Sequence, residues 1–324
     1  KGYVFSSTSD TEVLLKLYLD FTKNARSIKE MLDVLNGVFA FALWNSKTKR
    51  LLVARDAFGV KPLYYSMRNN GFSFSSEIKA LKVLLGTVGS HDALAIESYL
   101  NFLWCPGDRT LSKDVKKLGP GEALIISNGE LEEHFKWFEL TTKKSPVRLA
   151  APLNYIERTR KLLGEAVHRQ MVSDVPVGAF LSGGLDSSSI VALARELDPD
   201  ITCYTIETSG NTDDGVVDDL PYAKEVANHL GVKLEVVKID PDHMLAGLED
   251  MVYQLDEPLA DLSSLNVLYI SRFARSQDIK VLLSGNGADE LFSGYRRHQA
   301  IQLDHSLDWM PKIFDKKLFE FFKS

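Results

Sequence analysis

The sequence has 324 residues, of which 45% are hydrophobic and 10% aromatic, which is enough chain for two ordinary domains with apolar cores. Its formal net charge is −6, so it carries no basic footprint for nucleic acid. No run of 18 apolar residues offers a membrane span, and composition therefore favours a soluble, acidic, cytoplasmic protein without nucleic-acid or membrane partners.

The two cysteines, Cys105 and Cys203, are far apart and have no Cys-x-x-Cys or histidine partner pattern. Neither a zinc site nor a disulfide framework is indicated, and both are expected to be buried small apolar residues. The chain begins at Lys1, without a methionine and in the middle of what looks like a domain. We expect it to be truncated at both ends.

The first third of the chain predicts antiparallel strands packed under helices. A Ser-Asp-Thr-Glu capping pattern from Ser9 opens an amphipathic helix within 7–24. Apolar runs at 37–44 and 50–54 predict a hairpin. Two shorter strands and two helices are expected at 62–66, 71–74, 78–85 and 92–102.

A second hairpin is predicted within 110–138, where Asn128-Gly129 is a strong turn signal between two short strands. The polar, proline-containing stretch that follows is typical of a linker. We therefore expect a first domain at 1–140, a linker at 141–152 and a second domain at 153–324, which opens with a helix.

The stretch 177–190 reads as a strand, a glycine turn and a helix, with Ser182-Gly-Gly-Leu-Asp-Ser-Ser188 at its centre. The glycines let the backbone turn around an anion, and the helix amides face that anion with the positive end of the dipole. Three serine hydroxyls add donors, and Asp186 offers a ligand for a phosphate-bound cation. The turn could also be purely structural, but phosphate is the natural occupant.

Beyond this loop, strands and helices alternate. Strands are expected at 201–206, 233–239 and 280–284, with helices through 222–230 and 244–255. Such alternation predicts a parallel sheet with helices on both faces. Ligands bind such sheets beyond the carboxyl ends of the strands. The loop at Ser182, the loop after Ile206 and the turn from Ser284 to Glu290 should therefore converge.

Two further acidic segments follow the first glycine loop in the chain. Asp289 and Glu290 open a helix after the second glycine turn, where they either complement the helix dipole or form a functional site together with the first loop. Asp256 and Glu257 belong to a third acidic cluster, for which helix caps in a solvated loop are an equally good interpretation.

The first half resembles the glutaminase domain of class II, N-terminal-nucleophile amidotransferases, through Ser9-Asp-Thr-Glu-Val13, the strand 37–44 and Ala54-Arg-Asp-Ala-Phe-Gly-Val-Lys-Pro-Leu-Tyr-Tyr65. The resemblance implies that Asp10 holds the amino group of glutamine, although a helix cap is an equal alternative. The family's nucleophile is an N-terminal cysteine, and Lys1 cannot replace it. This chain as given is not expected to hydrolyse glutamine.

The glycine-serine loop and Leu283-Ser-Gly-Asn-Gly-Ala-Asp-Glu-Leu-Phe-Ser-Gly-Tyr295 resemble the ATP-pyrophosphatase domain of the glutamine-dependent asparagine synthetases. The resemblance implies an ATP-dependent carbon-nitrogen ligase that releases AMP and pyrophosphate. It implies ATP and Mg²⁺ as cofactors, with Asp186 and Asp289 as catalytic metal ligands. Glutamine or ammonia and an aspartate-like carboxylate acceptor would be the partners; a homodimer is left open. The ATP-binding residues would be Phe180, Ser182, Gly183, Gly184, Leu185, Asp186, Ser187, Ser188, Ile206, Ser284 and Gly285.

The acceptor-substrate residues would be Asp256, Glu257 and Asn286, and the last departs from the family, which usually has a glutamate there. Asparagine cannot act as a base. Another residue then does that work, or the acceptor is not aspartate. Two alternatives follow: an amidotransferase or cyclase with a different acceptor, and a nucleotide-binding homologue without catalysis.

Overall fold

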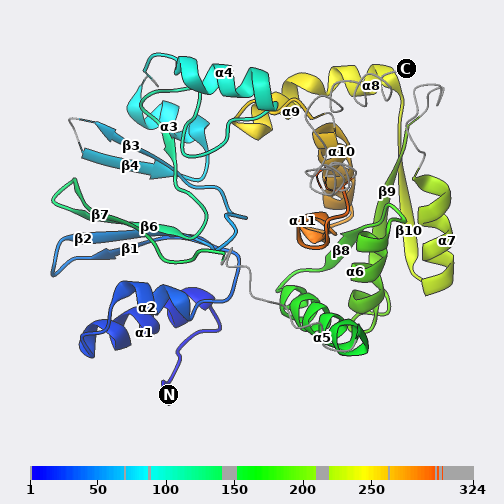
Figure 1. Cartoon of the computed structure of the whole chain (residues 1–324), viewed down its shortest axis with the longest axis horizontal. Coiled ribbons are helices and arrows are strands. Elements are labelled where there is room, and N and C mark those ends of the chain that lie inside the picture. The colour runs from blue at the N-terminus through cyan, green and yellow to red at the C-terminus, as the bar shows by residue number, and fades with distance from the viewer. Residues whose placement is uncertain are drawn as a thin grey trace, which may run out of the picture. The chain divides into compact units, whose positions relative to one another are not determined.

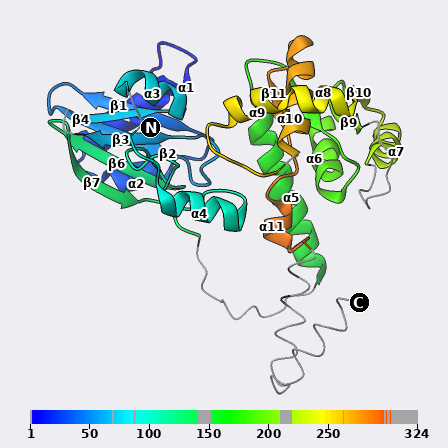
Figure 2. The ribbon, with the colours of Figure 1, turned by 90° about the horizontal axis from the view of Figure 1, so that it is seen from above.

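The computed structural model describes residues 2–68, 71–86, 89–140, 152–208, 219–261 and 263–295, with residues 298 and 301. Contacts divide the chain into two compact units (Figures 1 and 2). Unit 1 comprises Lys1–Pro146 and Glu249–Asp261, and unit 2 comprises Val147–Leu248 and Leu262–Ser324. The predicted linker lies almost wholly in 141–151, outside the described residues.

Unit 1 holds two antiparallel sheets. The larger has the strand order β1-β2-β6-β7 and the smaller the order β4-β3-β5. The strands are β1 (Ala40–Asn45), β2 (Arg50–Arg55), β3 (Tyr64–Arg68), β4 (Gly71–Ser75), β5 (Lys116–Lys117), β6 (Glu122–Ser127) and β7 (Glu130–Lys136). The helices of its first segment are α1 (Asp10–Lys23), α2 (Ile28–Asp33), α3 (Ile78–Leu85) and α4 (Ala93–Phe102).

These elements stack as helix, sheet, sheet and helix (Figure 1). Successive side chains of a strand face opposite sides, so Ala123 and Ile125 of β6 pack with Phe21 of α1, whereas Leu124 and Ile126 pack toward the smaller sheet. On its other face, the smaller sheet packs against α3. Strands β2 and β6 are consequently buried on both faces at their centres.

Unit 2 is built on a parallel sheet with the strand order β10-β9-β8-β11. Its elements are α5 (Pro152–Met171), β8 (Val177–Phe180), α6 (Leu185–Arg195), β9 (Thr202–Thr208), α7 (Leu220–Leu230), β10 (Lys233–Ile239), α8 (Pro241–Ala246), α10 (Ser263–Ser276), β11 (Val281–Leu283) and α11 (Ala288–Phe292). Helix α9 (Leu248–Leu255) lies in unit 1 apart from its first residue.

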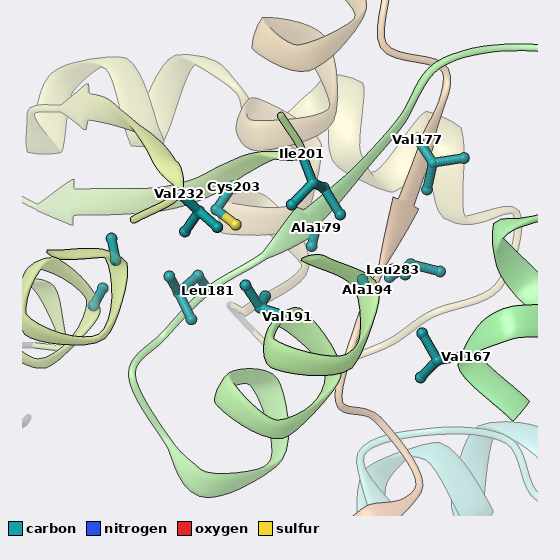
Figure 3. Packing of buried hydrophobic residues seen from close by; sticks show 12 residues of the cluster. Val167, Val177, Ala179, Leu181, Val191, Ala194, Ile201, Cys203, Val232 and Leu283 are labelled. Atoms are coloured by element: carbon teal, nitrogen blue, oxygen red, sulfur yellow. The ribbon is translucent and has the colours of Figure 1, made fainter. Parts of the chain in front are cut away.

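Helices cover both faces of this sheet, as the sequence predicted. Ala179, Leu181 and Cys203 pack with residues of α5, α6 and α7, and Figure 3 shows this cluster. Their strand neighbours Phe180 and Tyr204 face the opposite side and pack with α10. The fold class is therefore confirmed: antiparallel sheets with helices, followed by a parallel-sheet domain.

Local detail departs from the sequence in three places. Ser9 caps α1 by accepting from the Thr11 amide, but Glu12 reaches back to the amides of Ser6 and Ser7 instead of closing a capping box. The single helix expected at 244–255 is two helices, which break at Gly247. Helices α2 and α10 were not predicted.

The Arg55-Asp56 pair organises the loop that follows β2. The Asp56 carboxylate is almost fully buried and accepts hydrogen bonds from the amides of Phe58, Val60 and Lys61. The guanidinium donates to the carbonyl oxygens of Gly59, Lys61 and Leu118. The two side chains thus satisfy backbone groups of the turn.

We predict that Asp56→Ala lowers the free energy of unfolding by about 3 to 5 kcal/mol, because three amides lose a charged acceptor. Urea unfolding measures the change. Asp33→Ala is the matched control, since Asp33 is exposed at the end of α2. Equal losses in the two variants would contradict the role of Asp56.

Candidate functional site

The first glycine loop of unit 2 joins β8 to α6. Leu181 continues the strand and donates its amide to the Tyr204 carbonyl. Gly183 then takes the left-handed conformation at φ 84°, and Gly184 is the N-cap of α6 at φ −68°. A Cβ on Gly183 would stand 2.5 Å from backbone atoms of Tyr222 and Ala223. The loop is therefore pressed against the start of α7, and only glycine fits there.

Serine hydroxyls line this loop. Ser182 Oγ lies 3.0 Å from Ser187 Oγ and accepts from the Gly184 amide at 3.3 Å. Ser188 Oγ is buried and has no hydrogen-bond partner among the described residues. The α6 N-cap, Gly184, has no side chain to cap the first-turn amides. The loop therefore presents hydroxyl and amide donors to an anion.

The second glycine loop touches the first. Gly285 follows β11, whose Leu283 pairs with Ala179 of β8. A Cβ on Gly285 would meet Asp186 Cβ and the Ser187 amide nitrogen, both at 2.9 Å. The two signature loops, about 100 residues apart, thus come into backbone contact, as predicted. The loop after Ile206 falls largely at 209–218, outside the described residues.

Acidic side chains gather at this contact. The pKa of Asp186 is raised by partial burial and then by the negative charges of Asp289 and Glu290. Asp186 and Asp289 form no salt bridge with any lysine or arginine of the described residues. Glu290 accepts a hydrogen bond from the Tyr295 hydroxyl at 2.6 Å. Like charges held close together, as those of Asp186 and Asp289 are, favour a bound cation.

The donor set fits Mg²⁺ only together with a substrate. Within the described ranges, no group of three or more histidine, cysteine, aspartate or glutamate side chains is arranged to hold a metal by itself. Mg²⁺ is commonly bound through one or two carboxylates plus substrate phosphates. Asp186 and Asp289, beside the donor-rich loop, supply that number of carboxylates.

Three of the residues predicted to bind ATP lie on, or directly after, three neighbouring strands. Phe180 ends β8, Ile206 lies on β9 and Ser284 directly follows β11. Phe180 and Ile206 are half-buried on the α10 face of the sheet, with Tyr204 and Ile270. The structure thus brings them to one region of unit 2.

The other predicted residues lie apart from one another. Asn286 is exposed in the second glycine loop of unit 2, and its backbone amide donates to Ser284 Oγ. Asp256 and Glu257 belong to unit 1, where they contact Lys79 and Lys117. Asp10 is the exposed first residue of α1, in the acidic first turn of that helix.

Sequence reasoning missed these lysine partners. Lys79 precedes Asp256 by 177 residues and Lys117 precedes Glu257 by 140 residues. No local pattern marks either lysine. The contact of Gly183 with Tyr222 and Ala223 was likewise unpredicted, although paired glycines before a helix signal a close backbone approach.

These features define a two-part protein in which two stacked antiparallel sheets precede a parallel-sheet domain. A family model described as asparagine synthase matches residues 158–323, and one described as glutamine amidotransferase domain matches residues 1–138. The chain belongs to the asparagine synthase family.

Several curated proteins are similar to this chain. Glutamine-hydrolysing asparagine synthetase 1 of Bacillus subtilis is 37% identical over 298 residues, covering 91% of this chain and 44% of the relative. Asparagine synthetase 3 of Bacillus subtilis is 32% identical, with coverages of 96% and 51%. Amidase chyE of Penicillium rubens is 30% identical, with coverages of 94% and 46%. The chain spans about half the length of these relatives.

Among the described residues, no helix is long and apolar enough to cross a membrane.

We predict that Gly183→Ala lowers the free energy of unfolding by about 3 to 5 kcal/mol, because its Cβ meets backbone at a positive φ. Gly184→Ala is the matched control. Its φ is ordinary and its Cβ would lie 3.4 Å from Ser182 Oγ, so a loss of about 1 kcal/mol or less is expected. Urea unfolding compares the pair, and a reversed order would refute the contact with α7.

Proposed function

We propose that unit 2 binds ATP and activates a carboxylate as an acyl-adenylate, which ammonia then converts into an amide. The observation that carries the proposal is the contact of Gly285 with the first turn of α6. This contact brings the second glycine loop, with its acidic residues, to the hydroxyl and amide donors of the first glycine loop. Membership of the asparagine synthase family supports the same reaction class. Glutamine as nitrogen donor, aspartate as acceptor, a homodimer and a cytoplasmic location belong to this proposal.

In the first step, an oxygen of the acceptor carboxylate attacks the α-phosphorus of ATP. A bond forms between the carboxylate oxygen and the α-phosphorus, and the bond between the α-phosphorus and the oxygen that bridges to the β-phosphorus breaks, so its electron pair leaves with pyrophosphate. Amides at the start of α6 and the hydroxyls of Ser182, Ser187 and Ser188 donate to the phosphate oxygens. Asp186 and Asp289 would hold Mg²⁺, which supplies neutralisation of phosphate charge.

In the second step, ammonia attacks the acyl carbon and AMP leaves with the carbon-oxygen bond pair. The nitrogen loses a proton as the amide forms. Asn286, which is exposed beside Ser284, cannot take that proton, although its side chain can donate to or accept from an acceptor group. The protein contributes chiefly by positioning the reactants and neutralising charge.

We expect Asp186→Asn to weaken binding of ATP with Mg²⁺ by about 2 to 4 kcal/mol, while adenosine binding stays unchanged, because one of two metal carboxylates is lost. Calorimetric titration with ATP, with and without Mg²⁺, measures this difference. Asp200→Asn is the matched control, since Asp200 is exposed beyond the far end of α6. Equal affinities of wild type and Asp186→Asn in every condition would exclude the metal assignment.

A second candidate function is activation of an acceptor other than aspartate. The observation that favours it is the neutral, exposed Asn286 in the second glycine loop. A neutral side chain removes repulsion toward an anionic acceptor that a glutamate would exert. A cyclase on this fold would use an internal amine, so its amide would form without glutamine or ammonia.

We predict that Asn286→Glu shifts acceptor preference toward aspartate in the full-length protein. The added carboxylate restores attraction for a substrate ammonium and repels additional anionic groups. Exchange of labelled pyrophosphate into ATP, measured across a panel of carboxylic acids, compares the variant with wild type. Efficient aspartate-dependent exchange by wild type would refute the altered acceptor. No exchange with any acid would favour the homologue without catalysis.

A further inference from the structure

The turn after α9 places Asp256 in an unusual conformation. Asp256 has a φ of 59°, in the left-handed region, and the Glu257 amide donates to the Leu255 carbonyl at 2.6 Å. This turn belongs to the segment Glu249–Asp261, which packs in unit 1 although the chain before and after it packs in unit 2. We call these thirteen residues the returning segment.

Asp256 caps a helix that lies 178 residues earlier in the chain. Its carboxylate accepts from the amides of Ile78 at 2.9 Å and Lys79 at 3.3 Å, the first two residues of α3. The N-cap residue of that helix, Glu77, makes no side-chain capping bond. A capping carboxylate from a distant segment therefore performs the task that a local aspartate usually performs.

Lys79 adds an ion pair to the same contact. Its Nζ lies 3.1 Å from the Asp256 carboxylate and donates to the Tyr253 carbonyl at 3.1 Å. The same nitrogen lies 5.0 Å from the centroid of the Tyr253 ring. The Asp256 side chain is only 8% exposed, so this pair is largely removed from water. Lys79 thus binds both the last turn of α9 and Asp256, the residue that follows this helix.

Glu257 makes the second attachment. Its Oε2 accepts from Lys117 Nζ at 2.9 Å, and the two side chains are 17% and 13% exposed. Lys117 also donates to the Cys105 carbonyl. Burial raises the pKa of Glu257, and the positive charges of Lys117 and Arg55 oppose that shift. The Ala260 amide, three residues later, donates to the Leu103 carbonyl at the end of α4.

These contacts leave the Asp256 and Glu257 carboxylates poorly suited to bind the acceptor substrate. Asp256 is already engaged by two amides and an ammonium, and Glu257 by a buried ammonium. Both negative charges would also repel the carboxylate that the proposed reaction activates. A holding role explains why each acid has a lysine partner in unit 1.

We propose that Asp256 and Glu257 are a two-carboxylate clasp that docks the returning segment on a surface of unit 1 formed by α3, β5 and the end of α4. The partner of this surface is a segment of the same chain. The clasp makes the folding of α3 depend on a segment that interrupts unit 2, so the two units unfold together. It goes beyond the proposed reaction and does not depend on it.

Amide hydrogen exchange tests the capping contact in the full chain. In Asp256→Ala, the amides of Ile78 and Lys79 should exchange at least about 10-fold faster, because they lose their acceptor. Asp256→Asn keeps an acceptor oxygen and should exchange within about 3-fold of wild type. Glu249→Ala is the control, since Glu249 is an exposed acid of the same segment. Unchanged exchange in Asp256→Ala, or equal acceleration in the control, would overturn the clasp.

Urea-dependent exchange tests the coupling of the units. Wild type should lose protection in α1 and in α6 at the same urea concentration. Glu257→Gln, which keeps the shape but removes the charge facing Lys117, combined with Asp256→Ala, should separate the two transitions. Transitions that are separate in wild type already, or that stay coincident in the double variant, would overturn the proposal. Neither measurement involves ATP binding, so failure of this proposal can be told apart from failure of the proposed reaction.

Discussion

The close packing of Gly285 on the first turn of α6 is the contact on which the candidate site depends. Strands β8 and β11 are neighbours, which makes their loops adjacent, but adjacency alone leaves room for side chains between them. Glycine removes that room, because any Cβ would lie 2.9 Å from Asp186 Cβ and the Ser187 amide nitrogen. The negative charges of Asp289 and Glu290 in the second loop thereby add to the burial that raises the pKa of Asp186.

Much of this arrangement could be predicted from the sequence because its signals are local. The hairpin around Asn128-Gly129 forms because both residues accept a positive φ, 52° and 84°. The strand, glycine turn and helix around Ser182 is equally local. Convergence of the two glycine loops followed from a topological rule on parallel sheets, which needs only the alternation of strands and helices.

Other features depend on contacts between residues distant in sequence. Helix α2 has only six residues, and its capping box from Ser27 to Glu30 is too short a signal against the surrounding loop. The break between α8 and α9 falls at Gly247, where a Cβ would meet the Tyr269 side chain. That crowding exists only after α10 has packed. The lysine partners of Asp256 and Glu257 are equally invisible along the chain, because each pair joins separate regions of the folded unit.

The four acids predicted to bind the metal or the acceptor differ in their neighbours; they are Asp186, Asp289, Asp256 and Glu257. Asp256 and Glu257 each meet a lysine, and their charges are neutralised within the protein. Asp186 meets acidic neighbours instead, and its pKa is raised by burial and then by the negative charges of Asp289 and Glu290, which no salt bridge of Asp186 among the described residues offsets. Burial raises the pKa of Glu257 as well, but there the charge of Lys117 opposes the rise, whereas the acidic neighbours of Asp186 add to it. Acidic neighbours of this kind are explained if a cation and its phosphates complete the site, so we propose the chemistry for Asp186 and Asp289 and the holding role for Asp256 and Glu257.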